Sequence, residues 1–482
     1  MNISALEQKK VSELHEIARR LGIRGYADLR RRDLIYEILG AEATAEAEGS
    51  DLPPRLGPAS DDRPAVPSRS VGTRASAPQR ESRRRRGRGP RRPISPDWPE
   101  YMQGYDPYAV VLEGLVRQTG VLEVLPDGYG FLRSPEYSYL PSPDDIYVSP
   151  SQIKRFSLRV GDTVDGQIRP PKEGERFFAL IRVHTVNGRS PEAFDERTEF
   201  DVLTPAYPDR ALRLETAPDA LATRVVDLVA PVGKGQRALV VAPPKAGRTV
   251  LLQEIARAVV ANEPEATVLV VLVDERPEEV TDFQRAVPGA EVVASTFDEP
   301  PERQVHVAEL AMEKARRLVE AGRDVVVVLD SLTGLARAYQ AVLDGNASAT
   351  GGLSAAALRG PKRLFGAARA VEEGGSLTLL ATVLTGTESE LDASVYRAFE
   401  GTGNMELVLD RDLARRGLFP AVDLEASGTR REEILLPPDR LRRVQALRQS
   451  LGDLGPAEAL GALLDRVRAT ESNSALLQSL DV

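Results

Sequence analysis

The fold of this chain is decided by residues 237–253, which read RALVVAPPKAGRTVLLQ. An apolar run with β-branched residues meets two prolines and a glycine and continues as a helical segment, which predicts a strand, a tight turn and a helix. Nucleotide-binding proteins use such a turn with the pattern G-x-x-x-x-G-K-S/T: backbone N–H groups surround the phosphates, the lysine reaches the terminal ones, and the hydroxyl binds Mg²⁺. Here Ala242 opens the turn, Arg248 replaces the lysine and Thr249 supplies the hydroxyl. Because a planar guanidinium is bulkier than an ammonium, we expect nucleotide binding to be retained and hydrolysis to suffer.

Composition limits the class of protein and the chemistry it can use. The chain has 482 residues, 42% of them hydrophobic, which is enough for two or three cores. It contains no window of about 20 uncharged apolar residues and no signal-peptide core, so we expect a cytoplasmic protein that does not engage a membrane. The absence of cysteine excludes disulfides, thiolate zinc sites and a cysteine nucleophile, and three scattered histidines argue against a histidine metal cluster. The chemistry must therefore rest on carboxylates, Arg, Lys and hydroxyls.

The charge is unevenly distributed along the chain. A formal net charge of −9 does not favour nucleic-acid binding by itself. However, residues 80–92 read RESRRRRGRGPRR and concentrate positive charge in one segment. This segment is expected either to add salt-sensitive RNA affinity or to serve as a solvated spacer.

Changes in composition divide the chain into five parts. Residues 1–40 show helical periodicity and predict a small helical module, while residues 41–115 are rich in Arg, Pro and Gly and are expected to be a disordered linker. Short alternating runs within residues 116–190 predict a small β-barrel, and residues 191–221 are expected to be a connector. From residue 222 to 482, apolar β-branched runs alternate with helical segments, which predicts a mostly parallel sheet covered on both faces, followed by C-terminal helices.

The barrel carries aromatic residues at strand spacing. Tyr129 and Phe131 are two residues apart and so lie on one face of a strand, where exposed rings can stack on bases. The alternative is that one ring belongs to the barrel core. The flanking glycines, Arg133 and the later segment 175–177 favour an oligonucleotide-binding face.

Three residues of the α/β part are candidates for chemistry. Asp330 ends a buried strand, the position from which a carboxylate holds Mg²⁺ in nucleotide hydrolases. Glu275 ends another strand and is a candidate general base, although an acid pair at the start of a helix is the alternative. Arg430, in a loop far along the chain, is either a surface arginine or an arginine finger that completes a neighbouring subunit's site.

Long strings in the chain resemble the Rho transcription termination factors of bacteria. They include GYGFLR from Gly128, PDDIYVSPSQI from Pro143, RPPKEGERFFAL from Arg169, VAPPKAG from Val241, DERPEEVT from Asp274, VASTFDEP from Val293 and GTGNMEL from Gly401. The resemblance runs from the N-terminal helices to about residue 433, interrupted by the basic linker. It implies a homohexameric ring of RecA-like P-loop ATPase domains, each preceded by an OB-type barrel. Such a ring would bind nascent single-stranded RNA, use ATP with Mg²⁺ to translocate, and act on the RNA polymerase elongation complex.

The same resemblance implies roles for individual residues. The residues expected to hold RNA are Gly128, Tyr129, Gly130, Phe131, Leu132, Arg133, Asp145, Ile146, Tyr147, Glu175, Arg176 and Phe177. Those expected around the nucleotide are Gly233, Lys234, Gly235, Gln236, Arg237, Ala238, Lys245, Ala246, Gly247, Arg248, Thr249, Val250, Arg276 and Phe419. Glu275 would be the general base, Arg248 and Arg430 would act with it in catalysis, and Thr249 and Asp330 would hold the metal.

The chain departs from the family pattern at several positions of the motor. Besides Arg248, it has Gly334 and Gly417 where the family usually has arginine, and Glu390 where the family offers a lysine to RNA inside the ring. The loop at 341–352 is shortened and lacks lysine. Our main interpretation is a Rho-type RNA-dependent ATPase. The alternative is a hydrolysis-impaired paralogue that serves as a non-catalytic RNA-binding or regulatory subunit and co-assembles with an active Rho; a generic RecA-like DNA motor is disfavoured by the aromatic barrel.

Overall fold

The computed structural model describes residues 116–171, 175–191, 197–344 and 353–480, together with Leu14 and residues 17–19. The chain divides into two compact units, Met1–Gly114 and Leu115–Val482. The predictions for nearly all of residues 1–40, for the linker at 41–115 and for most of the loop at 341–352 lie outside the described residues.

Residues 116–186 form a closed five-stranded barrel, as the short alternating runs predicted. Its strands, in the order β1-β2-β3-β5-β4 around the barrel, are β1 (Val116–Val124), β2 (Gly130–Arg133), β3 (Ile146–Val148), β4 (Thr163–Arg169) and β5 (Phe178–Val186). Every second residue of β4 is buried, which is the period of a strand with one face in a core. Helix α5 (Pro150–Arg155) begins with a capping box formed by Ser149 and Gln152.

The second part of this unit is a nine-stranded, mostly parallel sheet with the path β14-β13-β7-β12-β10-β8-β9. Its strands are β6 (Pro205–Ala206), β7 (Arg237–Ala242), β8 (Thr267–Glu275), β9 (Glu291–Thr296), β10 (Asp324–Asp330), β11 (Arg369–Val371), β12 (Ser376–Leu384), β13 (Met405–Val408) and β14 (Gly428–Thr429). Strands β7, β8, β9, β10, β12 and β13 are parallel to their neighbours on this path, and β14 is antiparallel. The predicted parallel sheet is confirmed.

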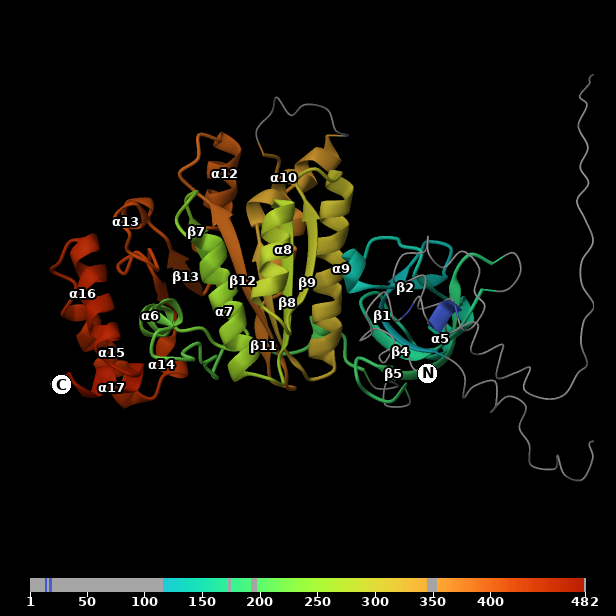
Figure 1. Cartoon of the computed structure of the whole chain (residues 1–482), viewed down its shortest axis with the longest axis horizontal. Coiled ribbons are helices and arrows are strands. Elements are labelled where there is room, and N and C mark those ends of the chain that lie inside the picture. Colours follow the sequence, from blue (N-terminus) through green and yellow to red (C-terminus); the bar gives the residue numbers. More distant parts are fainter. Residues whose placement is uncertain are drawn as a thin grey trace, which may run out of the picture. The chain divides into compact units, whose positions relative to one another are not determined.

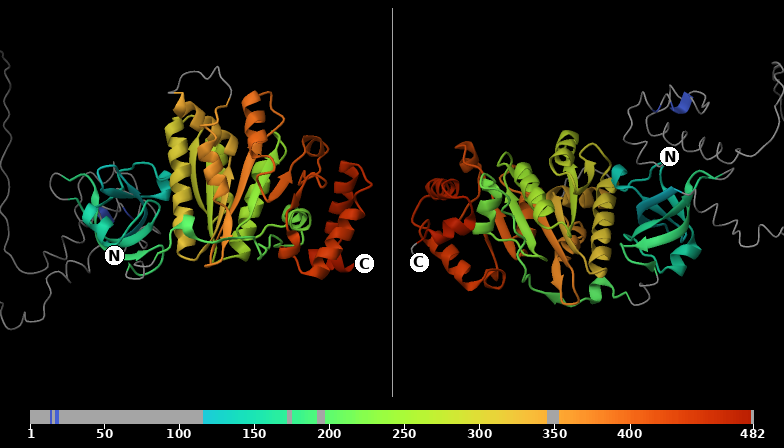
Figure 2. Two further views of the ribbon diagram at one scale, coloured as in Figure 1. Left: turned by 180° about the vertical axis from the view of Figure 1, so that it is seen from behind. Right: turned by 60° about the horizontal axis from the view of Figure 1, so that its bottom comes forward.

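Helices cover both faces of the sheet (Figures 1 and 2). They are α6 (Leu221–Val229), α7 (Arg248–Asn262), α8 (Pro277–Ala286), α9 (Pro301–Glu320), α10 (Leu332–Leu343), α11 (Arg359–Gly366), α12 (Glu390–Phe399), α13 (Arg411–Arg415), α14 (Glu432–Leu435), α15 (Pro438–Gln449), α16 (Pro456–Arg468) and α17 (Asn473–Gln478). Val326 and Val328 face a core shared with α6, α7 and the C-terminal helices, whereas Val325 and Val327 face a core shared with α9, α10 and α12. The continuous apolar run of β10 therefore fills two cores, because successive side chains of a strand point to opposite faces.

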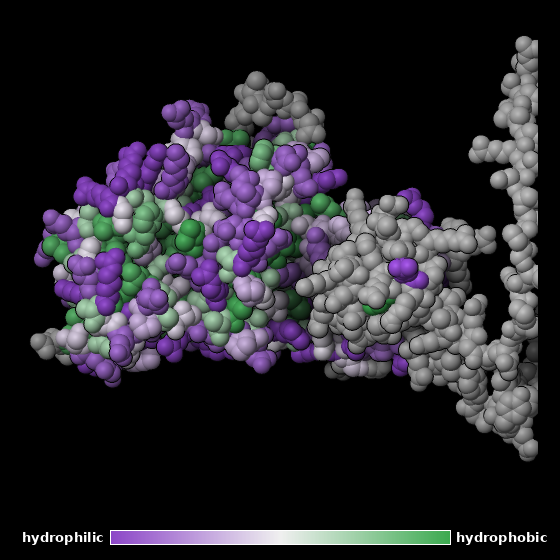
Figure 3. Space-filling view, in the orientation of Figure 1, coloured by the Kyte–Doolittle hydropathy of each residue, from purple (hydrophilic) through white to green (hydrophobic). Residues whose placement is uncertain are grey.

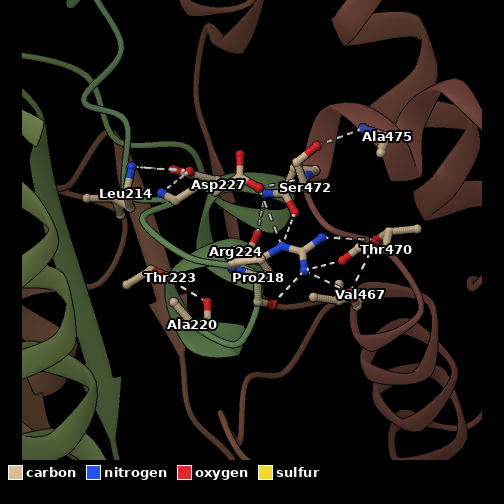
Figure 4. A network of polar contacts seen from close by, with 12 residues as sticks. Leu214, Pro218, Ala220, Thr223, Arg224, Asp227, Val467, Thr470, Ser472 and Ala475 are labelled. Carbon is tan, nitrogen blue, oxygen red and sulfur yellow. Dashed lines mark hydrogen bonds and ion pairs between the residues drawn. The ribbon is translucent and has the colours of Figure 1, made fainter.

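A buried arginine fastens the C-terminal helices to α6 (Figure 4). Arg224 donates hydrogen bonds to the carbonyl oxygens of Val467 and Thr470 and to the Asn473 side chain, although the residue is fully buried. On the same helix, the Asp227 carboxylate accepts hydrogen bonds from two backbone N–H groups, those of Leu214 and Glu215. Polar groups this deeply buried are tolerated only when they are hydrogen-bonded, so this network fixes where the C-terminal helices pack.

The barrel contacts the edge of the sheet through η3 (Pro135–Tyr137) and the residues after it. The Ser138 hydroxyl accepts a hydrogen bond of 2.9 Å from the Ala294 backbone N–H of β9, and the Tyr139 hydroxyl donates to the Glu291 carboxylate. Gly161 adopts a φ of +88°, and a Cβ there would lie 2.4 Å from the Glu313 backbone. The contacts of Ser138 and Tyr139 thus occupy part of the edge strand β9.

Hydrophilic side chains are interspersed with apolar ones over the face of the sheet domain shown in Figure 3. None of the helices among the described residues has the length and apolar character needed to cross a lipid bilayer.

Candidate nucleotide site and RNA-binding face

The turn between β7 and α7 has the shape of a phosphate loop. Ala242, at the position of the usual first glycine, is the last residue of β7 and is fully buried, so its methyl group belongs to the core. Lys245 and Gly247 both adopt positive φ, of 66° and 85°, and Gly247 is the N-cap of the 15-residue helix α7. The N-terminus of such a helix attracts anions, because its first N–H groups lack intrahelical partners and its dipole is positive there.

Arg248 points from this loop into a group of carboxylates. Its guanidinium donates to the Glu275 carboxylate, and its Nε lies 3.1 Å from Oδ2 of Asp330. Burial lowers the pKa of Arg248, but the attraction of Asp330, Glu275 and Glu279 outweighs it and holds the pKa above its ordinary value. The guanidinium is therefore charged and is held by acids on the neighbouring strands β8 and β10.

Glu275 stands at the end of β8, where a register irregularity and the positive φ of Asp274 turn the chain. Bulges of this kind redirect a side chain. Burial, together with repulsion from Asp330 and Glu279, raises the pKa of Glu275 to about 7, although Arg248 opposes the shift. A carboxylate with a pKa near neutrality has the basicity of a general base.

Asp330 ends β10 and is almost completely buried. It accepts a hydrogen bond of 2.6 Å from the Thr382 hydroxyl, and burial raises its pKa in spite of Arg248. Its carboxylate and the Thr249 hydroxyl are the oxygen ligands that suit Mg²⁺. Each has a protein partner in this structure, because the Thr249 hydroxyl also donates to Glu279 at 3.0 Å. Among the described residues, no cluster of three or more His, Cys, Asp or Glu side chains is arranged to hold a metal.

The aromatic residues of the barrel gather into one patch. Tyr129, Phe131, Tyr147 and Phe177 come from β2, β3 and the segments beside them, with ring centroids 4.9 Å apart for Phe131 and Phe177 and 5.8 Å apart for Tyr129 and Tyr147. Phe131 is largely buried by the other rings, and those three remain partly exposed. Partly exposed rings held side by side by neighbouring strands form a stacking platform for unpaired bases.

Some of the other residues predicted to hold RNA lie inside the barrel and support the patch, and others lie on its surface. Arg133 is buried, pairs with Glu123 at 2.6 Å and with Asp145, and lies 5.1 Å above the Phe131 ring, so its charge is used inside the barrel. Leu132 and Ile146 belong to the barrel core. Arg176 is exposed beside Phe177, and the Glu175 carboxylate pairs with Arg169.

Three family models match the chain. The RNA-binding domain of Rho termination factor matches residues 118–192, and the Rho N-terminal domain matches residues 5–47. The nucleotide-binding domain of the ATP synthase alpha/beta family matches residues 222–429.

Relatives match over most or all of the chain. The transcription termination factor Rho of Pseudomonas aeruginosa is 45% identical over 484 aligned residues, covering 100% of this chain and 99% of that protein. The chain belongs to the Rho family of transcription termination factors. The Rho proteins of Chromobacterium violaceum and Aquifex aeolicus are 55% and 53% identical, over 75% and 76% of this chain and 87% and 85% of their own lengths.

In this Rho-family chain, the residues predicted around the nucleotide occur at two opposite ends of β7. Lys245–Val250 follow the strand, and the Phe419 ring lies against Gly247 beside them. Gly233–Ala238 precede and begin the strand, which is six residues or about 20 Å long, and Ala238 is fully buried there. The structure therefore does not bring these two segments together within one subunit. Arg276 is the exposed N-cap residue of α8, next to Glu275.

Arg430 lies at the same end of β7 as Gly233–Arg237. Its backbone N–H donates to the Asn404 carbonyl, and Asn404 is bonded in turn to Arg237. The exposed guanidinium reaches the Gly401 carbonyl at 3.4 Å and lines a hollow of about 340 Å³ with Glu400 and Glu406. An arginine side chain cannot span the length of β7, so Arg430 cannot act on the phosphate loop of its own subunit.

Sequence reasoning missed four residues that surround the candidate site. Glu279 and Thr382 contact the two predicted metal ligands, and Arg337 links Asp274, at 3.2 Å, to the buried Asp392 of α12. Thr382 has a visible signal, since it is a polar residue at a fully buried position of an apolar strand. Arg337 and Asp392 are 55 residues apart, and no local pattern pairs them.

The structure also shows the surroundings of the positions at which the ATPase part of the chain departs from the family pattern. Glu390 is exposed at the first turn of α12, where Ser389 caps the helix. A Cβ on Gly334 would lie 2.6 Å from Cβ of Asp274, so no other side chain fits there without moving the residue next to Glu275. Gly417 adopts a φ of +74°, and a Cβ there would point into open space, with no atom of a non-adjacent residue within 4 Å.

Proposed function

We propose that this chain binds single-stranded RNA on the aromatic patch of its barrel and uses RNA-dependent ATP hydrolysis to move along a transcript and release it from RNA polymerase. The observation that carries the proposal is the meeting of the phosphate loop, Glu275 and Asp330 beside one another at the ends of β7, β8 and β10. The family membership supports the same function, because relatives that align over the whole chain are named transcription termination factor Rho.

The proposed chemistry assigns a task to each group. Backbone N–H groups of the loop, with Lys245 and Arg248, would hold the phosphates of ATP, and Phe419 would lie against the base. Glu275 would take the proton of the attacking water, a role that its pKa of about 7 suits. When bound by Thr249 and Asp330, Mg²⁺ would neutralise charge on the phosphates.

A ring of identical subunits is part of the proposal. The loop lies at one end of β7 and Arg430 at the other. A head-to-tail interface would bring Arg430 of one subunit to the loop of the next, and such interfaces close into rings. The hexamer, the polymerase partner and a cytoplasmic location remain predictions.

A non-catalytic RNA-binding subunit is the less favoured alternative, because the relatives named as termination factors align over the complete chain. Slowed hydrolysis is a finer proposal within the main function. It is supported by the contact of Arg248 with the proposed base and by the exposed negative charge of Glu390. A polyanion is bound mainly through charge neutralisation, so Glu390 would weaken the hold on RNA inside the ring.

The test is steady-state ATP hydrolysis by the full chain with and without pyrimidine-rich RNA. We expect RNA to raise the rate, and an unchanged rate would reject the proposed function. The double variant Arg248→Lys, Glu390→Lys, compared with the control Glu373→Lys on an exposed turn elsewhere, tests the finer proposal. A gain of about tenfold or more in RNA-stimulated turnover would support slowed hydrolysis in the natural chain, and an equal or lower rate would contradict it.

A further inference from the structure

The guanidinium of Arg248 lies among the residues that are candidates to bind the metal and to act as the base. Its guanidinium contacts Asp330, a predicted metal ligand, and Glu275, the predicted base, and the third acid of the group, Glu279, contacts the Thr249 hydroxyl. We call the residues around Arg248, namely Thr249, Glu275, Glu279 and Asp330, the acid cluster. It contains three carboxylates and one hydroxyl, all partly or fully buried.

The contact of Arg248 with the acid cluster leaves donor capacity unused. Its Nε lies 3.1 Å from Asp330 but makes no hydrogen bond, and it is buried from solvent. A buried donor without an acceptor is costly. A guanidinium has five N–H donors in a planar fork, so it can contact acids on one side and phosphate oxygens on another at the same time. A lysine ammonium is a compact point charge and bridges two such groups less well.

We propose that Arg248 serves as a built-in counter-cation, which competes with Mg²⁺ for the acid cluster and makes ATP binding by this chain largely independent of Mg²⁺. The inference rests on the proposed nucleotide site and deepens it. Without the metal, the guanidinium links the carboxylates of Asp330 and Glu275 to the incoming phosphates. When Mg²⁺ is present, its binding to Asp330 adds less to the affinity for ATP, because this carboxylate already has a cationic partner.

The experiment measures equilibrium binding of labelled ATP to the full chain, once with excess Mg²⁺ and once with excess EDTA. In the natural chain we expect removal of Mg²⁺ to weaken binding by less than about threefold, and in Arg248→Lys by more than about tenfold. The matched control is Arg257→Lys, which makes the same exchange on the exposed side of α7 and should behave as the natural chain does. Arg248→Gln provides a second variant, in which the dependence on Mg²⁺ should also increase.

The possible outcomes distinguish a failure of the proposed role of Arg248 from a failure of the proposed nucleotide binding. If the natural chain loses as much ATP affinity in EDTA as Arg248→Lys does, the proposed role of Arg248 as a counter-cation is wrong. Binding of ATP by the natural chain in Mg²⁺ would in that case still support the proposed nucleotide site. Absence of binding by the natural chain in Mg²⁺ overturns both. A larger dependence on Mg²⁺ in both Arg248 variants, with Arg257→Lys unchanged, supports the inference.

Discussion

The barrel and the sheet domain assemble their candidate sites in different ways. In the barrel, the aromatic patch comes from residues 129–177, and its rings are placed side by side by two neighbouring strands and the segments beside them. In the sheet domain, the acid cluster joins the ends of three strands, and the proposed arginine finger lies at the far end of β7. The aromatic patch lies within one subunit, whereas the proposed nucleotide site would take its arginine finger from a second copy. Changes in the aromatic patch should therefore alter RNA affinity and leave turnover at saturating RNA unchanged, whereas changes in the acid cluster should alter turnover.

The largest expected effect is on the proposed general base. Glu275→Gln keeps the shape of the side chain and removes its basicity, so RNA-stimulated ATP hydrolysis should fall by about a hundredfold to ten-thousandfold. Binding of RNA by the barrel should stay within about twofold, because the patch belongs to another region. Hydrolysis retained within about tenfold would show that Glu275 is not the general base.

The division of the sheet site between subunits predicts complementation. Arg430→Ala and Glu275→Gln should each be nearly inactive, but rings assembled from equal amounts of both should regain activity at about a quarter of their interfaces, where an intact loop meets an intact finger. Steady-state hydrolysis of the mixture, measured after the subunits are unfolded and refolded together, checks this. If the mixture hydrolyses ATP no faster than either variant alone, Arg430 does not act on the phosphate loop of a neighbouring subunit. The proposed difference between the nucleotide site and the aromatic patch would then be wrong.

A smaller effect is expected at the barrel. Tyr147→Ala removes one partly exposed ring of the patch and should weaken binding of single-stranded RNA by about fivefold to 150-fold, since each stacked base contributes about 1–3 kcal/mol. Hydrolysis at saturating RNA should be unchanged. The control Tyr207→Ala removes an exposed ring outside the barrel and should leave RNA affinity as it is. Equal losses in the two variants would contradict a specific stacking face.

The smallest effect concerns stability and should appear in the sheet domain. Burial raises the pKa of Asp227 from 3.8 to about 7, against the hydrogen bonds of two backbone N–H groups. A folded-state pKa above the unfolded one means that the folded state holds a proton which the unfolded state has released. This contribution to stability is complete below about pH 4 and is lost as the pH rises through about 7.

In the natural chain, the free energy of unfolding should decrease between these pH values because of Asp227. Asp227→Asn should remove this decrease, which amounts to a few kcal/mol at most, since each pKa unit corresponds to about 1.4 kcal/mol. Chemical denaturation at several pH values measures it. The exposed Asp219→Asn is the control, and parallel curves for the natural chain and Asp227→Asn would contradict a raised pKa.

The sequence by itself determined the local features of the fold. The apolar runs at 237–241, 267–273, 291–295, 324–329 and 376–382 all lie in strands of the sheet, because β-branched residues buried on both faces leave a continuous pattern. The turn after Ala242 and the placement of Glu275 and Asp330 at strand ends were likewise readable, since each depends on a few neighbouring residues.

Only the tertiary structure decided which of these features meet. Strand order brought Arg248 onto Glu275 and Asp330, and packing paired Arg337 with Asp392 and Gly334 with Asp274. The same packing placed Arg430, which is far along the chain, at the opposite end of β7 from the phosphate loop. Contacts between residues tens to hundreds of positions apart depend on the order of strands in the sheet and on the fit of buried side chains, and neither leaves a local pattern in the chain.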